Sequence, residues 1–248
     1  METVIAIGIV AVLLSTFLAV FGPATQNIRR AVSAKDAERL TGALEQWMTS
    51  YDPDRSAQTG APYDTAFDRA FDAVVAKSTN NSELALIAYQ YRADPENRRT
   101  ADQSFQPFTG DLQRSVAGQD YVLKSVVRPL NEENTLIRDD VAAIEGRAFF
   151  VKLRPLQKTG APGSREFKPL GDNGGSNVQA IINNLPGDQG NSIDTVNYVP
   201  FQAEFYALPS TAPGFMQNGA ENYIRTKIFP TTGDGLSPVL VQNMVLTR

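Results

Sequence analysis

An uninterrupted apolar segment near the N-terminus constrains this chain more than any other feature. Residues 4–21 run for about 18 residues without a charge and are apolar on every face of a helix. Such a helix is roughly 27 Å long, close to the hydrocarbon thickness of a bilayer. A core helix of a soluble domain is normally amphipathic, so the segment favours a membrane span. Its large apolar side chains are Val4, Ile5, Ile7, Ile9, Val10, Val12, Leu13, Leu14, Phe17, Leu18, Val20 and Phe21.

A cleaved secretory signal is the other reading of this segment. Such a signal begins with a basic region, and its apolar stretch is shorter. Here Met1, Glu2 and Thr3 supply no positive charge. The pattern therefore favours a retained anchor over a cleaved signal.

The helical pattern continues beyond the apolar segment and becomes amphipathic. Gly22 and Pro23 should kink or locally melt the helix. We predict one helix over residues 2–50, on the order of 70 Å long. Its later apolar stripe consists of Ile28, Val32, Leu40, Leu44, Trp47 and Met48. The predicted segments are a transmembrane half (1–22), an amphipathic half that packs on the head (23–50) and a globular head (51–248).

The composition excludes several kinds of chemistry. The chain has neither cysteine nor histidine. This excludes disulfides, thiolate nucleophiles, histidine bases and histidine-ligated metals. Adjacent acids such as Asp139 and Asp140 are typical of a solvated surface, so we assign them no catalytic role and predict that the protein is not an enzyme. The net charge of -4, with scattered basic residues, predicts no nucleic-acid partner.

The head has the pattern of an α+β fold. Successive strand-like segments favour an antiparallel β-sheet with one face covered by helix. The long N-terminal helix is expected to pack on that sheet. We predict a short helix at 64–77, strands at 84–91, 121–127, 148–154, 201–207, 223–229 and 239–246, and loops at 51–62, 94–118 and 158–177.

The stretch Glu2-Thr3-Val4-Ile5-Ala6-Ile7-Gly8-Ile9-Val10 resembles the N-terminal region of the type IV pilin family, which includes the pseudopilins of type II secretion systems. The resemblance covers roughly the first 50 residues. It implies a pilin-like fold, in which the long helix packs on an antiparallel sheet and its apolar half, residues 1–22, forms the filament core. It also implies that Glu2 pairs with the N-terminal amine of a neighbouring subunit, because a lone carboxylate in a low-dielectric environment is costly.

The resemblance implies a function and a location. The function is that of a structural subunit, minor or specialised, of a type IV pilus or a type II secretion pseudopilus. Its partners would be copies of itself or other pilin-like subunits, the membrane and, if a leader lies upstream, prepilin peptidase. The location would be the bacterial inner membrane, crossed once with the head outside the cytoplasm, and then a periplasmic or extracellular filament.

Alternatives to this interpretation remain open. The chain can be a signal-anchored periplasmic binding or interaction domain that does not polymerise, with Glu2 lying among the lipid headgroups. Arg29 and Arg30 follow the span, and the positive-inside rule alone would place the head in the cytoplasm. A basic leader upstream would reverse that balance. The topology therefore follows from the resemblance.

Three aspartates on glycine turns are candidate calcium ligands. Asp172, Asp188 and Asp234 each lie beside glycine, in loops that can present several oxygen atoms. Asp beside Gly is also ordinary turn chemistry, and no EF-hand spacing is present. We therefore predict no cofactor and keep calcium as the alternative.

Overall fold

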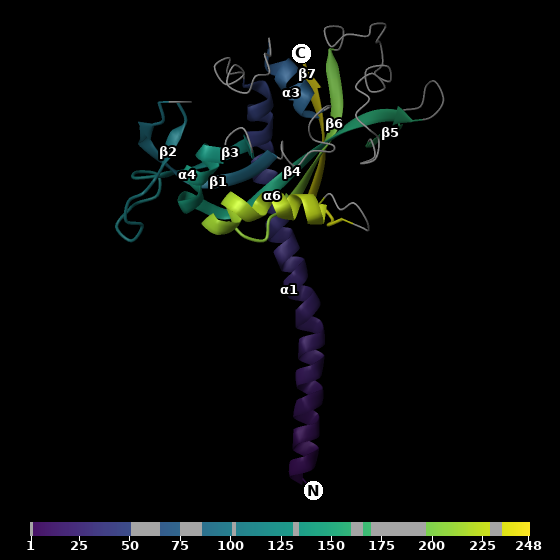
Figure 1. The fold of residues 1–248 in the computed structure, drawn as a ribbon. Coiled ribbons are helices and arrows are strands. Elements are labelled where there is room, and N and C mark those ends of the chain that lie inside the picture. The colour runs from purple at the N-terminus through teal and green to yellow at the C-terminus, as the bar shows by residue number, and fades with distance from the viewer. Residues whose placement is uncertain are drawn as a thin grey trace.

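One long helix projects from a head built of a sheet and short helices (Figure 1). The computed structural model describes residues 2–50, 65–74, 86–100, 103–130, 134–159, 166–169, 197–228 and 235–248. Helix α1 spans Glu2–Thr49, 48 residues in a single element, which confirms the predicted long helix. It runs through Gly22 and Pro23 without a break, and a kink at these residues stays a prediction.

In the part of the chain that the structure describes, the head is organised around a seven-stranded antiparallel sheet, as the sequence predicts in outline. Its order is β2-β1-β4-β6-β7, with β3 paired to β1 and β5 paired to β4. The long strand β4 pairs with β1 on one side and β6 on the other, so it connects the two halves of the sheet. The strands are β1 Leu86–Arg98, β2 Phe105–Pro107, β3 Val122–Pro129, β4 Ile144–Thr159, β5 Glu166–Pro169, β6 Tyr198–Ala207 and β7 Leu240–Thr247.

Helices pack on both faces of the sheet, which corrects the prediction of one covered face. Alternation along β4 sends Phe149 and Val151 to the face that α1 covers together with α3 (Ala66–Asp72), and sends Phe150 to the opposite face. The second face is covered by α4 (Asn134–Asp140), η3 (Val141–Ala143), η5 (Phe215–Gly219), α6 (Ala220–Tyr223) and η6 (Ile224–Ile228). Each face therefore has its own apolar core.

The strand predicted at 223–229 is wrong. Its described part is helical, because Ile224 and Ile228 lie four residues apart and both are buried against the sheet. An alternation of aromatic, basic and β-branched residues fits a strand equally well over so short a segment. Packing of Ile224 and Ile228 against the sheet favours the helix over the strand.

Two predicted loops contain regular structure. Strand β1 extends to Arg98, and β2 follows within the predicted loop at 94–118. The loop at 158–177 contains β5, which pairs with the end of β4. The short helix α3 lies inside the predicted helix at 64–77, and its N-cap Thr65 accepts a hydrogen bond from the Asp68 backbone N–H at 3.2 Å. The predicted loop at 51–62 lies outside the described residues.

Helix α1 enters the core only in its last third. Leu40, Leu44 and Met48 are 1%, 0% and 3% exposed, whereas Ile28 and Val32 are 63% and 50% exposed. The buried stripe begins at Ser33, which is 2% exposed. The stripe was predicted to begin at Ile28, more than one helical turn before the first buried residue. The predicted boundary between the two halves, after residue 22, stays a prediction.

Replacing Leu44 with alanine tests this attachment. Leu44→Ala removes a fully buried side chain between α1 and the sheet, and we expect a loss of about 2–5 kcal/mol in the free energy of unfolding. The same substitution at Leu18, which is 64% exposed on the same helix, should change it by less than about 0.5 kcal/mol. Denaturation in detergent, followed through the fluorescence of the single tryptophan Trp47, measures both values. Equal losses would contradict this packing.

Candidate functional site

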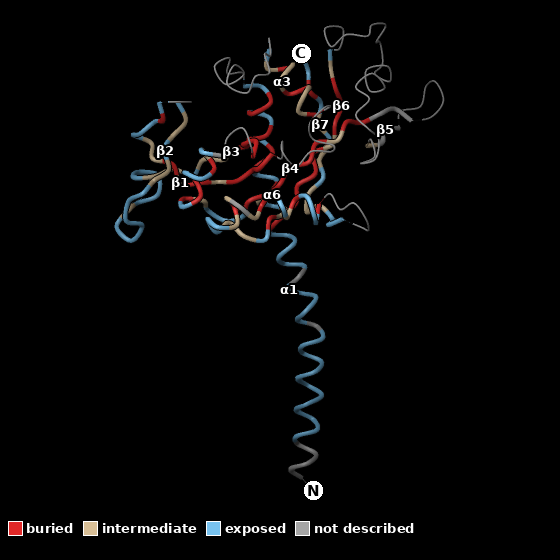
Figure 2. Tube along the Cα trace, in the orientation of Figure 1, coloured by how far each residue is buried: buried red, intermediate tan, exposed pale blue. Residues whose placement is uncertain are grey.

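The exposed apolar part of α1 is the candidate functional site. Figure 2 shows this half of the helix as exposed along its described length, while the opposite end is buried in the head. By length and composition this helix can cross a membrane, and none of its most apolar window is buried. The exposed fractions are Ile7 70%, Ile9 57%, Val10 62%, Val12 66%, Leu13 63%, Leu14 60%, Phe17 53%, Leu18 64% and Phe21 50%.

The polar side chains described in this half, those of Ser15 and Thr16, are satisfied inside the helix. Ser15 Oγ donates to the Ala11 carbonyl oxygen at 2.7 Å, and Thr16 Oγ1 donates to the Val12 carbonyl oxygen at 2.8 Å. These bonds matter because an unpaired donor is costly in hydrocarbon. The rest of the described surface of this half is apolar.

Several predicted site residues receive no side-chain description. Glu2 is the first residue of α1, but its side chain lies outside the described part, as do those of Val4, Ile5 and Val20. The pairing role of Glu2 therefore stays a prediction. Asp172, Asp188 and Asp234 also lie outside the described residues, so the calcium alternative stays a prediction too.

Polar contacts fix the head to α1. Arg147, at the start of β4, donates to the Ser33 hydroxyl, and Thr41 Oγ1 donates to Gln242 Oε1 of β7 at 3.1 Å. The Arg69 guanidinium of α3 donates to the Trp47 carbonyl oxygen and lies 4.5 Å from the centre of the Trp47 ring. Strands β4 and β7 and helix α3 of the head thus contact α1 through side chains at three different positions along its axis.

A buried ionic cluster lies on the second face of the sheet. Asp140 is fully buried and accepts hydrogen bonds from the guanidinium groups of Arg99 and Arg128 and from the Tyr89 hydroxyl, the last at 2.7 Å. Burial is the main cause that raises the pKa of Tyr89 well above its ordinary value, so the hydroxyl keeps its proton and donates. The expectation that Asp139 and Asp140 are both solvated is therefore wrong for Asp140.

The arrangement of this cluster suits stability better than chemistry. The carboxylate of Asp140 is enclosed, and both of its oxygen atoms already accept hydrogen bonds. A reacting group needs access and a position for substrate. Burial of Asp140 could not be read from the sequence, because it depends on arginines from two distant strand regions.

Comparisons with known proteins give no further guidance. No family model matches the chain, and neither the curated proteins nor the solved structures give a match. The functional argument therefore depends on the residues and geometry described above.

Two neighbouring aspartates test the role of the buried cluster. Asp140→Asn leaves two buried arginines without their counter-charge, and we expect a loss of about 3–5 kcal/mol in the free energy of unfolding. Asp139→Asn changes an exposed neighbour on the same helix and should cost less than about 0.5 kcal/mol. Urea denaturation of both variants measures the difference. A small loss for Asp140→Asn would show that the buried charges are not coupled.

Proposed function

We propose that this protein is a structural subunit, minor or specialised, of a filament of the type IV pilus or type II secretion pseudopilus kind. The observation that carries the proposal is the exposure of the apolar half of α1 on a helix whose other end is fixed in the head. A surface of this size and apolarity requires lipid or other protein around it. A pilin-like subunit uses both, first the membrane and then its neighbours.

The proposed assembly step exchanges lipid for packed helices. Lipid tails are as apolar as leucine, so no hydrophobic gain favours the exchange, and close packing must supply specificity. Gly8, Ala11, Ser15 and Ala19 recur at helical spacing and form a face of small side chains. A Cβ atom added at Gly8 would meet nothing within 4 Å, so the surface at this position is open. This face allows helix backbones to approach closely.

Glu2 is proposed to set the register between subunits. An ionised carboxylate near the start of the apolar helix is costly in a helix-lined core. Pairing with the N-terminal amine of a neighbour offsets that cost only in the correct register. The head then lies on the outside of the filament, and before assembly the subunit crosses the bacterial inner membrane once with its head outside the cytoplasm.

The main rival is an anchored periplasmic binding or interaction domain that does not polymerise. Both proposals need the apolar helix, so membrane insertion alone does not separate them. They differ in whether the apolar half contacts other helices. Filament formation that depends on Glu2 is expected only for the pilin-like subunit.

Substitution of Glu2 tests assembly separately from anchoring. In cells that produce the chain, Glu2→Ala should reduce filaments by tenfold or more in electron micrographs, because removal of a pairing worth about 1.4 kcal/mol already shifts an equilibrium tenfold. Glu45→Ala changes an exposed glutamate on the same helix and should leave filaments unchanged. Both variants should remain in the membrane fraction after alkaline extraction. Normal filaments with Glu2→Ala would remove Glu2 from assembly.

A further inference from the structure

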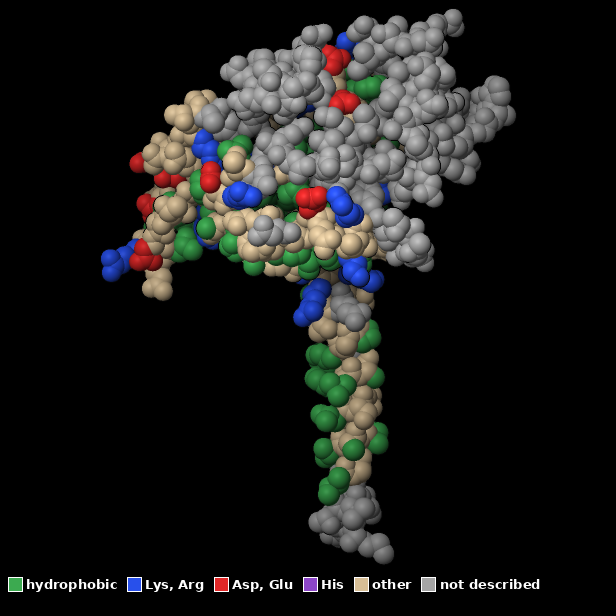
Figure 3. Space-filling view, viewed as in Figure 1, with side chains coloured by type: hydrophobic (Ala, Val, Ile, Leu, Met, Phe, Trp, Pro, Cys, Tyr) green, Lys and Arg blue, Asp and Glu red, His purple; other side chains and the backbone are tan. Residues whose placement is uncertain are grey.

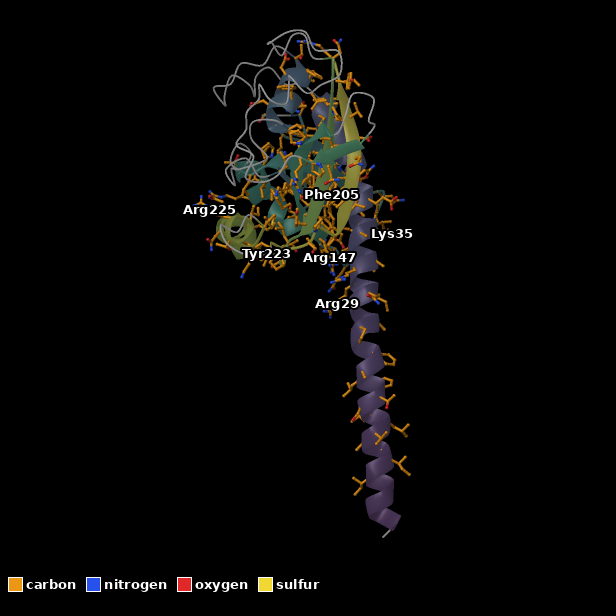
Figure 4. All side chains as sticks on the ribbon, turned by 90° about the vertical axis from the view of Figure 1, so that its right-hand side faces the viewer. Arg29, Lys35, Arg147, Phe205, Tyr223 and Arg225 are labelled. Atoms are coloured by element: carbon orange, nitrogen blue, oxygen red, sulfur yellow. The ribbon has the colours of Figure 1, made fainter. Side chains whose placement is uncertain are left out.

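Exposed cations lie where α1 enters the head and on the lower side of the head beside it. Figure 3 shows Lys and Arg side chains where the stalk meets the head. Figure 4 shows Arg29 and Arg147 together at this junction, with Tyr223 on the lower side of the head and Arg225 toward its outer edge. We define the basic collar as the exposed residues Arg29, Arg30 and Lys35 of α1, Arg147 of β4, and Arg225 and Lys227 of η6.

The basic collar contrasts with the acidic chain to which it belongs. The whole chain has a net charge of -4, yet no acidic residue occurs between Glu2 and Asp36. Among the described acids near the collar, Glu221 pairs with Arg225 at 3.2 Å and Glu145 binds Arg92. Asp36 is only half-exposed, and the exposed Glu38 lies about 4.5 Å farther from the apolar half along the helix axis than Lys35. The collar therefore presents a local positive field to whatever lies beneath the head.

The span of α1 sets the height of the collar above a membrane. If Phe21 marks the hydrocarbon boundary, Arg29 lies about 12 Å farther along the axis, at 1.5 Å per residue. The headgroup layer is roughly 5–8 Å thick on each side of a bilayer. Side chains of a helix lean toward its N-terminus, so the long side chains of Arg29 and Arg30 point back toward the headgroups.

The other collar residues lie on the lower side of the head, to one side of the helix. Arg147 is held at the level of Ser33 by its hydrogen bond, about 18 Å beyond Phe21. Membrane helices tilt by about 20° on average, and electrostatic attraction is screened over about 8 Å at physiological salt. A tilt toward α6 brings η6 down to the surface. Tyr223 is then on the lowered side, and tyrosine is a residue type enriched at membrane interfaces.

From this geometry we propose that the basic collar docks the head on anionic phospholipid headgroups and thereby sets the tilt of α1. The proposal rests only on the membrane-anchoring part of the proposed function. Arg29, Arg30 and Lys35 follow the span on the same helix, so the anchored protein always holds this part of the collar close to headgroups. A soluble polyanion would have to enter the space between the head and the membrane. Each basic residue near an anionic surface should raise the ratio of docked to undocked heads about fivefold.

Fluorescence transfer from the full-length protein to headgroup-labelled lipid tests the proposal. The chain lacks cysteine, so Thr226→Cys on η6 gives one donor site beneath the head, and Thr247→Cys gives one near the C-terminus at the far side (Figure 1). The protein is reconstituted into phosphatidylcholine vesicles with or without a minority of the anionic lipid phosphatidylglycerol. Transfer from position 226 should increase on anionic vesicles. Transfer from position 247 should not.

Charge variants and salt identify the cause. Lys227→Gln should reduce the docked ratio on anionic vesicles about fivefold. Thr247→Glu changes the net charge by the same amount at the far side of the head, and it should have no effect when the donor is at 226. Salt at 1 M, where the screening length is about 3 Å, should remove the difference between the two lipids.

The outcomes separate this proposal from the proposed function. A protein that floats with neutral vesicles but gives equal transfer from position 226 on both lipids overturns the docking surface and leaves the anchor intact. A protein that fails to float with either lipid overturns both. An equal response to Lys227→Gln and Thr247→Glu would attribute the effect to total charge and also overturn the collar.

Discussion

The packing of one end of α1 across the sheet is the contact on which the rest of the molecule depends. Leu40, Leu44 and Met48 bury completely against β-strands, and Arg147, Thr41 and Arg69 take part in polar contacts around them. Because α1 is a single helix, the position of the head determines where the apolar half points. The same helix thus belongs to two environments. Its buried third is held by tertiary packing, while its apolar half needs a solvent other than water.

The sheet face opposite α1 is also covered by helices, so its apolar side chains are buried as well. α4, α6 and the short helical turns beside them close a second core over Tyr89, Phe150 and Tyr206. Buried charges within this layer are paired, as in the cluster at Asp140 and in Glu204, which accepts hydrogen bonds from Arg154 at 3.0 Å and from Tyr206 at 2.7 Å. Paired burial limits the desolvation cost of each charge. Among the described residues both faces of the sheet are therefore covered by helix, whereas the apolar half of α1 is exposed.

Patterns that act within one element could be predicted from the sequence, whereas features that need several elements could not. The long helix and most long strands follow from local periodicity, which needs no knowledge of the fold. The helix at Ile224 was missed because a short segment fits two periods and the sheet decides between them. The burial of Asp140 was missed because Arg99 and Arg128 approach it from elsewhere in the chain. The apolar candidate site was visible because its residues are contiguous. The basic collar was not, because β4 and η6 complete it.

The exposed neck of α1 has a further consequence for how this chain can vary. Residues between Phe21 and Ser33 are helical and make no part of either core among the described residues. With 3.6 residues per turn, inserting or deleting one residue there would rotate the head by about 100° about the helix axis. Removing seven residues, about two turns, would keep nearly the same facing but lower the head by roughly 10 Å. The number of neck residues therefore sets both the direction in which the head faces and its height above the apolar half.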